Sequence, residues 1–165
     1  MFKVIGIDPG LADTGIGIVR GEGMEIAGFS FGSIHTSSRN PFPARLDRIY
    51  SRLSELFQAE SPDLIVVEDV FSLERYPKSG LILGKVTGVI LLAACRAAVP
   101  TCEVPVREAK QVLTGNGNAD KKQLEKAVRH FLAMVQPIRP YHASDALGLA
   151  MIGLFRHSDR LPRRL

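Results

Sequence analysis

Short apolar runs bounded by turn residues predict three strands at the start of the chain. They cover Phe2–Asp8, Gly15–Arg20 and Met24–Ile34. A tight turn at residues 21–23 joins the second strand to the third, and the first connection is also short. Connections this short only join antiparallel neighbours. We therefore expect an antiparallel meander with Phe2–Asp8 in a central position.

Helical spacing replaces this pattern after the breakers of residues 37–43. Apolar residues then recur at intervals of three and four and predict one helix that ends before Pro62. Its apolar face consists of Leu46, Ile49, Tyr50, Leu53, Leu56 and Phe57. The strand Asp63–Val67 follows this helical crossover, so it should lie parallel to the first strand.

The segment Val70–Ser79 has the composition of a loop, and the helix predicted after it, Gly80–Ala98, is apolar in nearly every direction. Such a helix is buried on more than one side, either in the core or at a subunit interface. A short strand at Thr101–Val104 and a helical turn at Pro105–Leu113 come next. A helix over Ala119–Met134 should follow and bury Leu124, Val128, Phe131 and Leu132. A last helix should cover His142–Phe155.

The order of these elements predicts an α/β fold. One mixed five-stranded sheet, antiparallel in its first three strands and parallel afterwards, would be flanked by helices. The length of 165 residues suits one domain, which we place at residues 1–157, followed by a basic tail at 158–165.

Composition, with 45% hydrophobic and 23% charged residues, is that of a soluble globular protein. Lys85 interrupts the longest apolar stretch, so we expect no membrane span. The N-terminus lacks the regions of a signal peptide. Cys95 and Cys102 show no CxxC spacing and are interpreted as reduced core thiols. These features predict a cytoplasmic protein.

The net charge of +4 favours a polyanionic partner. Lys110, Lys121 and Lys122 flank a Gly/Asn loop, Thr114–Asn118. This loop could present backbone N–H groups to a phosphate, as segments before a helix often do. It could equally be a flexible surface turn, and the sequence leaves both readings open.

Three acids stand where apolar elements begin or end. Asp8 and Glu68 each follow an apolar run, and Asp145 lies where the apolar last helix begins. Alone, each has an ordinary explanation as a turn residue, a loop acid or a first-turn acid. Isolated charges at the ends of buried elements are costly unless they are paired or hold a metal. Together they predict a divalent-metal site and metal-assisted hydrolysis of a phosphate ester.

Six short motifs resemble those of the RuvC family of bacterial Holliday junction resolvases, in the ribonuclease H-like superfamily. The resemblance extends over almost the whole chain. The motifs are Gly6–Gly10, Val67–Phe71, Leu83–Val89, Lys110–Val112, Gly115–Lys121 and Ser144–Leu147.

The resemblance implies a homodimeric endonuclease that uses two Mg²⁺ ions per subunit, with Mn²⁺ as a substitute, to cut four-way DNA junctions by paired symmetric nicks. It implies catalytic metal ligands at Asp8, Glu68 and Asp145, and a catalytic role for Lys121. His142 stands where the best-known relatives have Asp and others have His. It lies three residues before Asp145, on the same side of a helical turn. His142 would therefore either bind metal or move a proton.

DNA contacts are also implied by this resemblance. Phe71 corresponds to the family's aromatic residue that stacks at the junction crossover, and Lys110 and Lys121 to its basic residues near the scissile phosphate. Tyr76 and Lys78 share the loop of Phe71, and Lys122 follows Lys121. The apolar helix Gly80–Ala98 would form the dimer interface. The branch-migration proteins RuvA and RuvB are expected partners.

Two other functions fit part of the pattern. An actin-like ATP-binding domain also begins with a strand, an Asp and a Gly-rich hairpin, but it needs two domains and a second phosphate-binding hairpin, which this chain lacks. A junction-binding protein that does not cut would not need the complete acid set.

Overall fold

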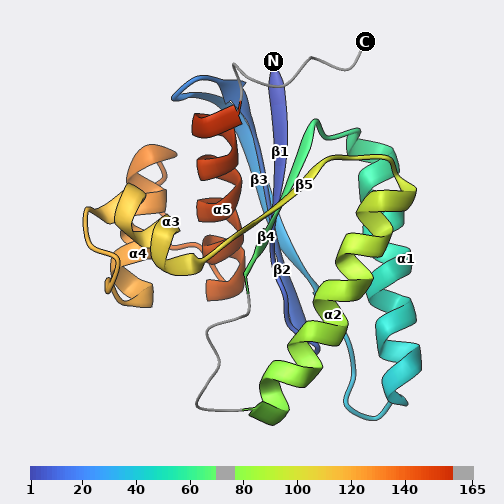
Figure 1. Ribbon diagram of the computed structural model, residues 1–165. Coiled ribbons are helices and arrows are strands. Elements are labelled where there is room, and N and C mark those ends of the chain that lie inside the picture. The colour runs from blue at the N-terminus through green and yellow to red at the C-terminus, as the bar shows by residue number, and fades with distance from the viewer. Residues whose placement is uncertain (70–76, 158–165) are drawn as a thin grey trace.

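The computed structural model describes residues 1–69 and 77–157, and their centre is one five-stranded sheet (Figure 1). The strand order is β3-β2-β1-β4-β5. Strands β1 to β3 pair antiparallel, whereas β4 and β5 run parallel to β1, which confirms the predicted mixed sheet. The strand bounds are Phe2–Asp8 (β1), Asp13–Glu22 (β2), Glu25–His35 (β3), Leu64–Glu68 (β4) and Thr101–Val104 (β5).

Helices cover both faces of the sheet (Figure 1). Helices α1 (Phe42–Glu60) and α2 (Pro77–Arg96) pack on one face, around a core that includes Ile49 and Ile90. The other face carries α3 (Val106–Thr114), α4 (Lys121–Phe131) and α5 (Tyr141–His157), around a second core that includes Leu147. The predicted helices are all present, with shifted ends.

Helix α2 departs from its prediction in two ways. It begins at Pro77, so residues 77–79 are helical and not loop as predicted. Its burial is also one-sided: Val86 is fully buried, but Leu81 is 69% exposed and Leu92 is 49% exposed. Among the described residues α2 is therefore buried on one side only.

By length and composition α2 could also cross a membrane, since the mean hydropathy of Lys78–Arg96 is 1.6. Core helices of soluble proteins meet the same criterion. Here Val86, Ile90 and Ala94 pack against α1 and the sheet in one of the two cores.

Two predictions about buried side chains are wrong. Phe131 is partly exposed, because α4 ends at this residue and its ring contacts only the edge of the core, at 5.9 Å from the ring of Phe155. Cys95 is exposed and is therefore not a core thiol, whereas Cys102 is half-buried and packs against the edge of the core. Cys95 lies on the side of α2 that the chain leaves uncovered.

Glycines let α5 lie directly against the sheet. A Cβ atom at Gly6 would lie 2.0 Å from the carbonyl oxygen of Ala146, and one at Gly17 would lie 2.4 Å from the backbone nitrogen of Leu147. Any side chain at these positions would therefore displace the helix. The close approach fixes the first turns of α5 beside the end of β1.

A buried glutamate fixes the segment that leads into α5. The side chain of Glu125, on α4, accepts a hydrogen bond of 2.8 Å from the backbone N–H of Ile138 and forms an ion pair with Arg129 at 2.7 Å. Buried charges are tolerated when they are paired and hydrogen-bonded in this way. The chain therefore reaches the start of α5 along a defined path.

We predict that Gly17→Ala destabilises the protein, because the added methyl group would push α5 off the sheet. Overpacking of this kind costs about 1–3 kcal/mol or more. The control is Gly32→Ala on neighbouring β3, where nothing lies within 4 Å of the added Cβ. Urea unfolding measures both variants, and equal stabilities would contradict the close approach of α5.

Candidate metal centre

Three elements bring the candidate ligands to one end of the sheet. Asp8 is the last residue of β1 and Glu68 the last of β4, and these strands are parallel neighbours in which Ile7 pairs with Val67. Parallel neighbours in this register end at the same edge of a sheet. The first turn of α5 adds His142 and, one turn further, Asp145.

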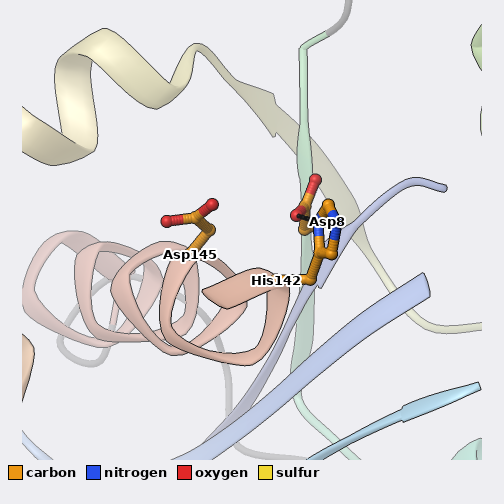
Figure 2. Close-up of side chains that lie close together, drawn as sticks. All are labelled: Asp8, His142 and Asp145. Atoms are coloured by element: carbon orange, nitrogen blue, oxygen red, sulfur yellow. Dashed lines mark hydrogen bonds and ion pairs between the residues drawn. The ribbon is translucent and has the colours of Figure 1, made fainter. Parts of the chain in front are cut away.

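Asp8, His142 and Asp145 form a compact group (Figure 2). Each offers a ligand atom, and these atoms all lie within 4.8 Å of one another. His142 Nδ1 lies 2.5 Å from Asp8 Oδ2. The two carboxylates are each only 6% exposed. Such a group could hold one metal ion among its oxygen and nitrogen atoms.

One carboxylate oxygen of this group lacks a partner. Asp145 Oδ1 is buried and accepts no hydrogen bond from residues 1–69 or 77–157. A buried, unpaired carboxylate oxygen is costly unless something compensates its charge. Hard divalent cations prefer oxygen ligands, and manganese also accepts imidazole. The donor set of the site therefore fits a divalent metal ion.

Glu68 lies beside this group. It lines a pocket of about 410 Å³ together with Asp8, His142 and Asp145. It does not belong to the set whose ligand atoms all lie within 4.8 Å of one another. The structure thus brings together the four predicted ligands, three of them tightly and Glu68 at the side.

Two acids of the site, Glu68 and Asp145, hold their protons more strongly than ordinary carboxyl groups. Burial, a hydrogen bond with Asp8 and the charges of Asp8 and Asp145 raise the pKa of Glu68 to about 9, although Lys121 opposes this shift. Burial and the charge of Asp8 raise the pKa of Asp145 to about 6. The hydrogen bond to Asp8 raises the pKa of His142. Burial is the largest cause for the two carboxyl groups, and the neighbouring Asp8 contributes to the pKa shifts of all three residues.

Two of the predicted lysines line the pocket and two do not. Lys110 on α3 and Lys121 at the start of α4 both line it, and both lower the pKa of Asp145. Lys122 and Lys78 are exposed and are not among the lining residues. The predicted aromatic residues Phe71 and Tyr76 lie outside the described residues.

The Gly/Asn loop does not present free N–H groups to a phosphate. The N–H of Asn116 donates to Thr114 Oγ1, that of Gly117 to Gln111 Oε1 and that of Asn118 to Asn116 Oδ1. Asp120 caps α4 and exchanges hydrogen bonds with Gln123. This network also differs from a flexible turn: it closes the loop and fixes where Lys121 begins its helix.

Sequence reasoning missed several residues of the pocket wall. The wall also includes Pro9, Gly10, Leu11, Ala12, Asp13, Asp69, Leu83 and Val106. The residues from Pro9 to Ala12 directly follow Asp8, and Asp69 directly follows Glu68, so chain adjacency to the acids was the available signal. Leu83 and Val106 come from helices on opposite faces of the sheet; Leu83 begins one of the motifs that resemble the family, whereas no local pattern marks Val106.

The strand order and the helices on both faces define a ribonuclease H-like fold, with acids gathered where two neighbouring parallel strands end. The family model described as crossover junction endodeoxyribonuclease RuvC matches residues 4–153. The chain belongs to the RuvC family of crossover junction endodeoxyribonucleases.

Individual relatives agree with this assignment. The crossover junction endodeoxyribonuclease RuvC of Syntrophomonas wolfei is 38% identical over 97% of this chain and 91% of its own length. The RuvC protein of Rubrobacter xylanophilus is 37% identical over 93% of this chain and 86% of its own length. Thermus thermophilus RuvC, in complex with a Holliday junction substrate, superposes with a TM-score of 0.88 at 31% identity, over 96% of both chains. The yeast mitochondrial Holliday junction resolvase shares the fold, with a TM-score of 0.62 at 14% identity.

We predict that the metal-free protein loses stability as the pH rises from about 5 to 8.5. The unfolded chain gives up its carboxyl protons near pH 4, whereas Asp145 and Glu68 keep theirs up to pKa values of about 6 and 9. Between these limits the folded state binds more protons, so stability falls with pH. His142 also has a raised pKa, so it too makes stability fall with pH, at pH values above the ordinary pKa of histidine.

Thermal unfolding in EDTA across this pH range measures the effect. Glu68→Gln should flatten the profile, because the variant carries no titrating group at this position. Glu103→Gln changes an exposed glutamate on β5 and serves as the control. Identical slopes in the two variants would show that Glu68 does not carry the predicted proton.

Proposed function

We propose that this chain resolves four-way DNA junctions as a homodimer, by paired symmetric nicks in two opposed strands. The observation that supports this proposal most directly is the compact group of Asp8, His142 and Asp145. Both aspartates are buried, and one carboxylate oxygen has no partner among the described residues. Two lysines face these acids across one pocket. The junction complex of the Thermus thermophilus relative supports the choice of substrate.

The metal centre would hold two Mg²⁺ ions per subunit, with Mn²⁺ as a substitute. Asp8, Glu68, His142 and Asp145 would hold these ions. Bound divalent cations supply Lewis acidity and lower the pKa of water at such sites. The raised pKa values of Glu68 and Asp145 mean that binding must displace protons.

His142 would act as a ligand in its neutral form. In the metal-free protein it is bound to Asp8, and this hydrogen bond raises its pKa. A ligating imidazole must be neutral. Acid conditions would therefore oppose metal binding through His142 as well as through the carboxyl groups.

Basic residues would bind the DNA backbone around these acids. Lys121 and Lys110, which line the pocket, would lie near the scissile phosphate and offset the charge that develops on it. Lys78 and Lys122, both exposed, would contact the backbone further out. Phe71 would stack at the crossover and Tyr76 would contact the DNA nearby, as the family resemblance implies.

Helix α2 would supply the dimer interface. Its buried face packs in the core of its own subunit, while Leu81, Ile82 and Leu92 leave a second apolar face uncovered. Apolar surface of this kind on a helix marks an interaction site. A twofold dimer would present two metal centres to the two strands that must be cut.

The nuclease domain would span residues 1–157, with residues 158–165 as a basic tail, in a cytoplasmic enzyme. RuvA and RuvB would bring it to junctions undergoing branch migration. Membership of the RuvC family removes the actin-like ATP-binding alternative, and a non-cutting junction binder would have no need for the crowded, buried acids.

We predict that Asp8→Asn binds four-way junctions normally but cuts them at least about 10³-fold more slowly, since each 1.4 kcal/mol of lost transition-state stabilisation is tenfold in rate. The assay compares nicking of four-way, Y-shaped and linear DNA with Mg²⁺ and with EDTA. Asp47→Asn, an exposed change on α1, is the control. Cutting by Asp8→Asn within tenfold of the unaltered protein would refute the proposed centre. Binding without any cutting by the unaltered protein would favour the non-cutting alternative.

We predict that the double substitution Leu81→Glu and Leu92→Glu yields folded monomers, because it places two charges on the uncovered face of α2. Sedimentation measures the mass, and circular dichroism confirms the fold. Val112→Glu, at a similarly exposed position on α3, should leave the dimer intact. A dimeric double variant would place the interface elsewhere. Val86 is unsuitable for this test because it is buried within its own subunit.

A further inference from the structure

The loop that directly follows Asp8 is held from outside the metal centre. Residues 9–12 join β1 to β2 and line the pocket beside Asp8. The carbonyl groups of residues 10, 11 and 12 each accept a hydrogen bond. Thr14 Oγ1 donates to the first at 2.8 Å, Thr36 Oγ1 to the second, and the N–H of Thr36 to the third at 2.9 Å. Thr36 alone therefore holds two of these carbonyls.

Arg45 fixes the direction in which Thr36 donates. Thr36 follows β3 and is only 2% exposed, and Arg45 lies in the first turn of α1. Arg45 Nε donates a hydrogen bond of 2.8 Å to Thr36 Oγ1. Arginine has donors only, so the Thr36 hydroxyl must accept from it and directs its own proton to the carbonyl of Leu11. Arg45, Thr36 and the loop thus form one directed chain of hydrogen bonds.

The far side of the same loop is fixed by α5. Gly15, which pairs with Asp8 across the sheet, lies so close to the helix that a Cβ atom there would be 2.1 Å from the carbonyl oxygen of His142. The loop between Asp8 and Gly15 is therefore clamped between the start of α5 and the pair Thr36–Arg45. Loosening one side would let the pocket wall move relative to Asp8 and His142.

We propose that Thr36 and Arg45 are positioning residues of the nuclease: they hold the wall formed by residues 9–12 in the geometry that cutting requires. The inference rests on the proposed nuclease function and adds to it two residues that touch none of the metal-binding side chains. A displacement of about 1 Å far from the reacting atoms can slow an enzyme by about 10²-fold. The constraint therefore matters for rate even though Thr36 and Arg45 take no part in the chemistry.

The sharpest test removes only the hydroxyl group. Thr36→Val keeps the shape of the side chain but leaves the Leu11 carbonyl and Arg45 Nε without their partner. We expect kcat for junction cutting to fall by about 10- to 100-fold, with KM and junction affinity essentially unchanged. Thr36→Ser keeps the hydroxyl and should restore most of the rate. Loss of rate in Thr36→Val without rescue by Thr36→Ser would indicate a packing role and overturn the proposal.

A matched pair of arginine variants tests the contribution of Arg45 to this chain of hydrogen bonds. Arg45→Ala should lower kcat, whereas Arg52→Ala removes the same charge from α1 but only an exposed pairing with Glu55, and should not. The competing role for Arg45 is a direct contact with a DNA phosphate. In that case Arg45→Ala would weaken junction binding and reduce its salt dependence by about one unit of log K per log salt, and this result would overturn the proposal.

The unaltered protein and Asp8→Asn are measured in the same assays. Their rates distinguish failure of the proposed nuclease function from failure of the positioning role of Thr36 and Arg45. If the unaltered protein cuts junctions, Asp8→Asn does not, and Thr36→Val and Arg45→Ala both cut at near-normal rates, the proposed function stands and the positioning role is refuted. If the unaltered protein does not cut, both fall. Because Arg45 is half-buried at the surface, Arg45→Ala remains a valid test even if Thr36→Val fails to fold.

Discussion

The burial of negative charge at one end of the sheet is the constraint on which the rest of the site depends. Asp8 and Asp145 lie close together, almost out of contact with water, and Glu68 stands beside them. Such a cluster opposes folding unless protons, cations or basic groups compensate it. The protein supplies His142 against Asp8 and places Lys110 and Lys121 in the same pocket, and a metal ion would complete the compensation.

Much of the scaffold serves to hold that unfavourable cluster together. The glycines of β1 and β2 admit α5 to van der Waals contact with the sheet, so His142 and Asp145 stay beside Asp8. Glu125 holds the segment before α5, and the closed loop before α4 sets the position of Lys121. These contacts hold the backbone around the site in place, although the acids of the site repel one another.

The sequence predicts the sheet and the acids well because both leave local signals. Apolar runs mark β1 and β4, and Asp8 and Glu68 directly follow them, so their meeting at one edge follows from parallel pairing alone. Burial against particular neighbours leaves no such signal: periodicity marks the inner face of α4 and correctly includes Leu132, but it does not reveal that Phe131 is left 39% exposed. Hydrogen bonds between distant segments, such as Arg45 to Thr36, and the closed bonding of residues 114–120 depend on three-dimensional approach and have no periodic pattern.

The hydrogen bond between Asp8 and His142 joins residues that are 134 positions apart in the chain. Asp8 ends the first strand and Glu68 ends the strand beside it, whereas His142 and Asp145 lie on α5, so the group is complete only once α5 has packed on the sheet. A chain in which α5 has not packed therefore lacks two of the four candidate ligands. Competence to cut DNA would arise only with the finished fold, so incomplete copies of this enzyme would pose no hazard to the chromosome.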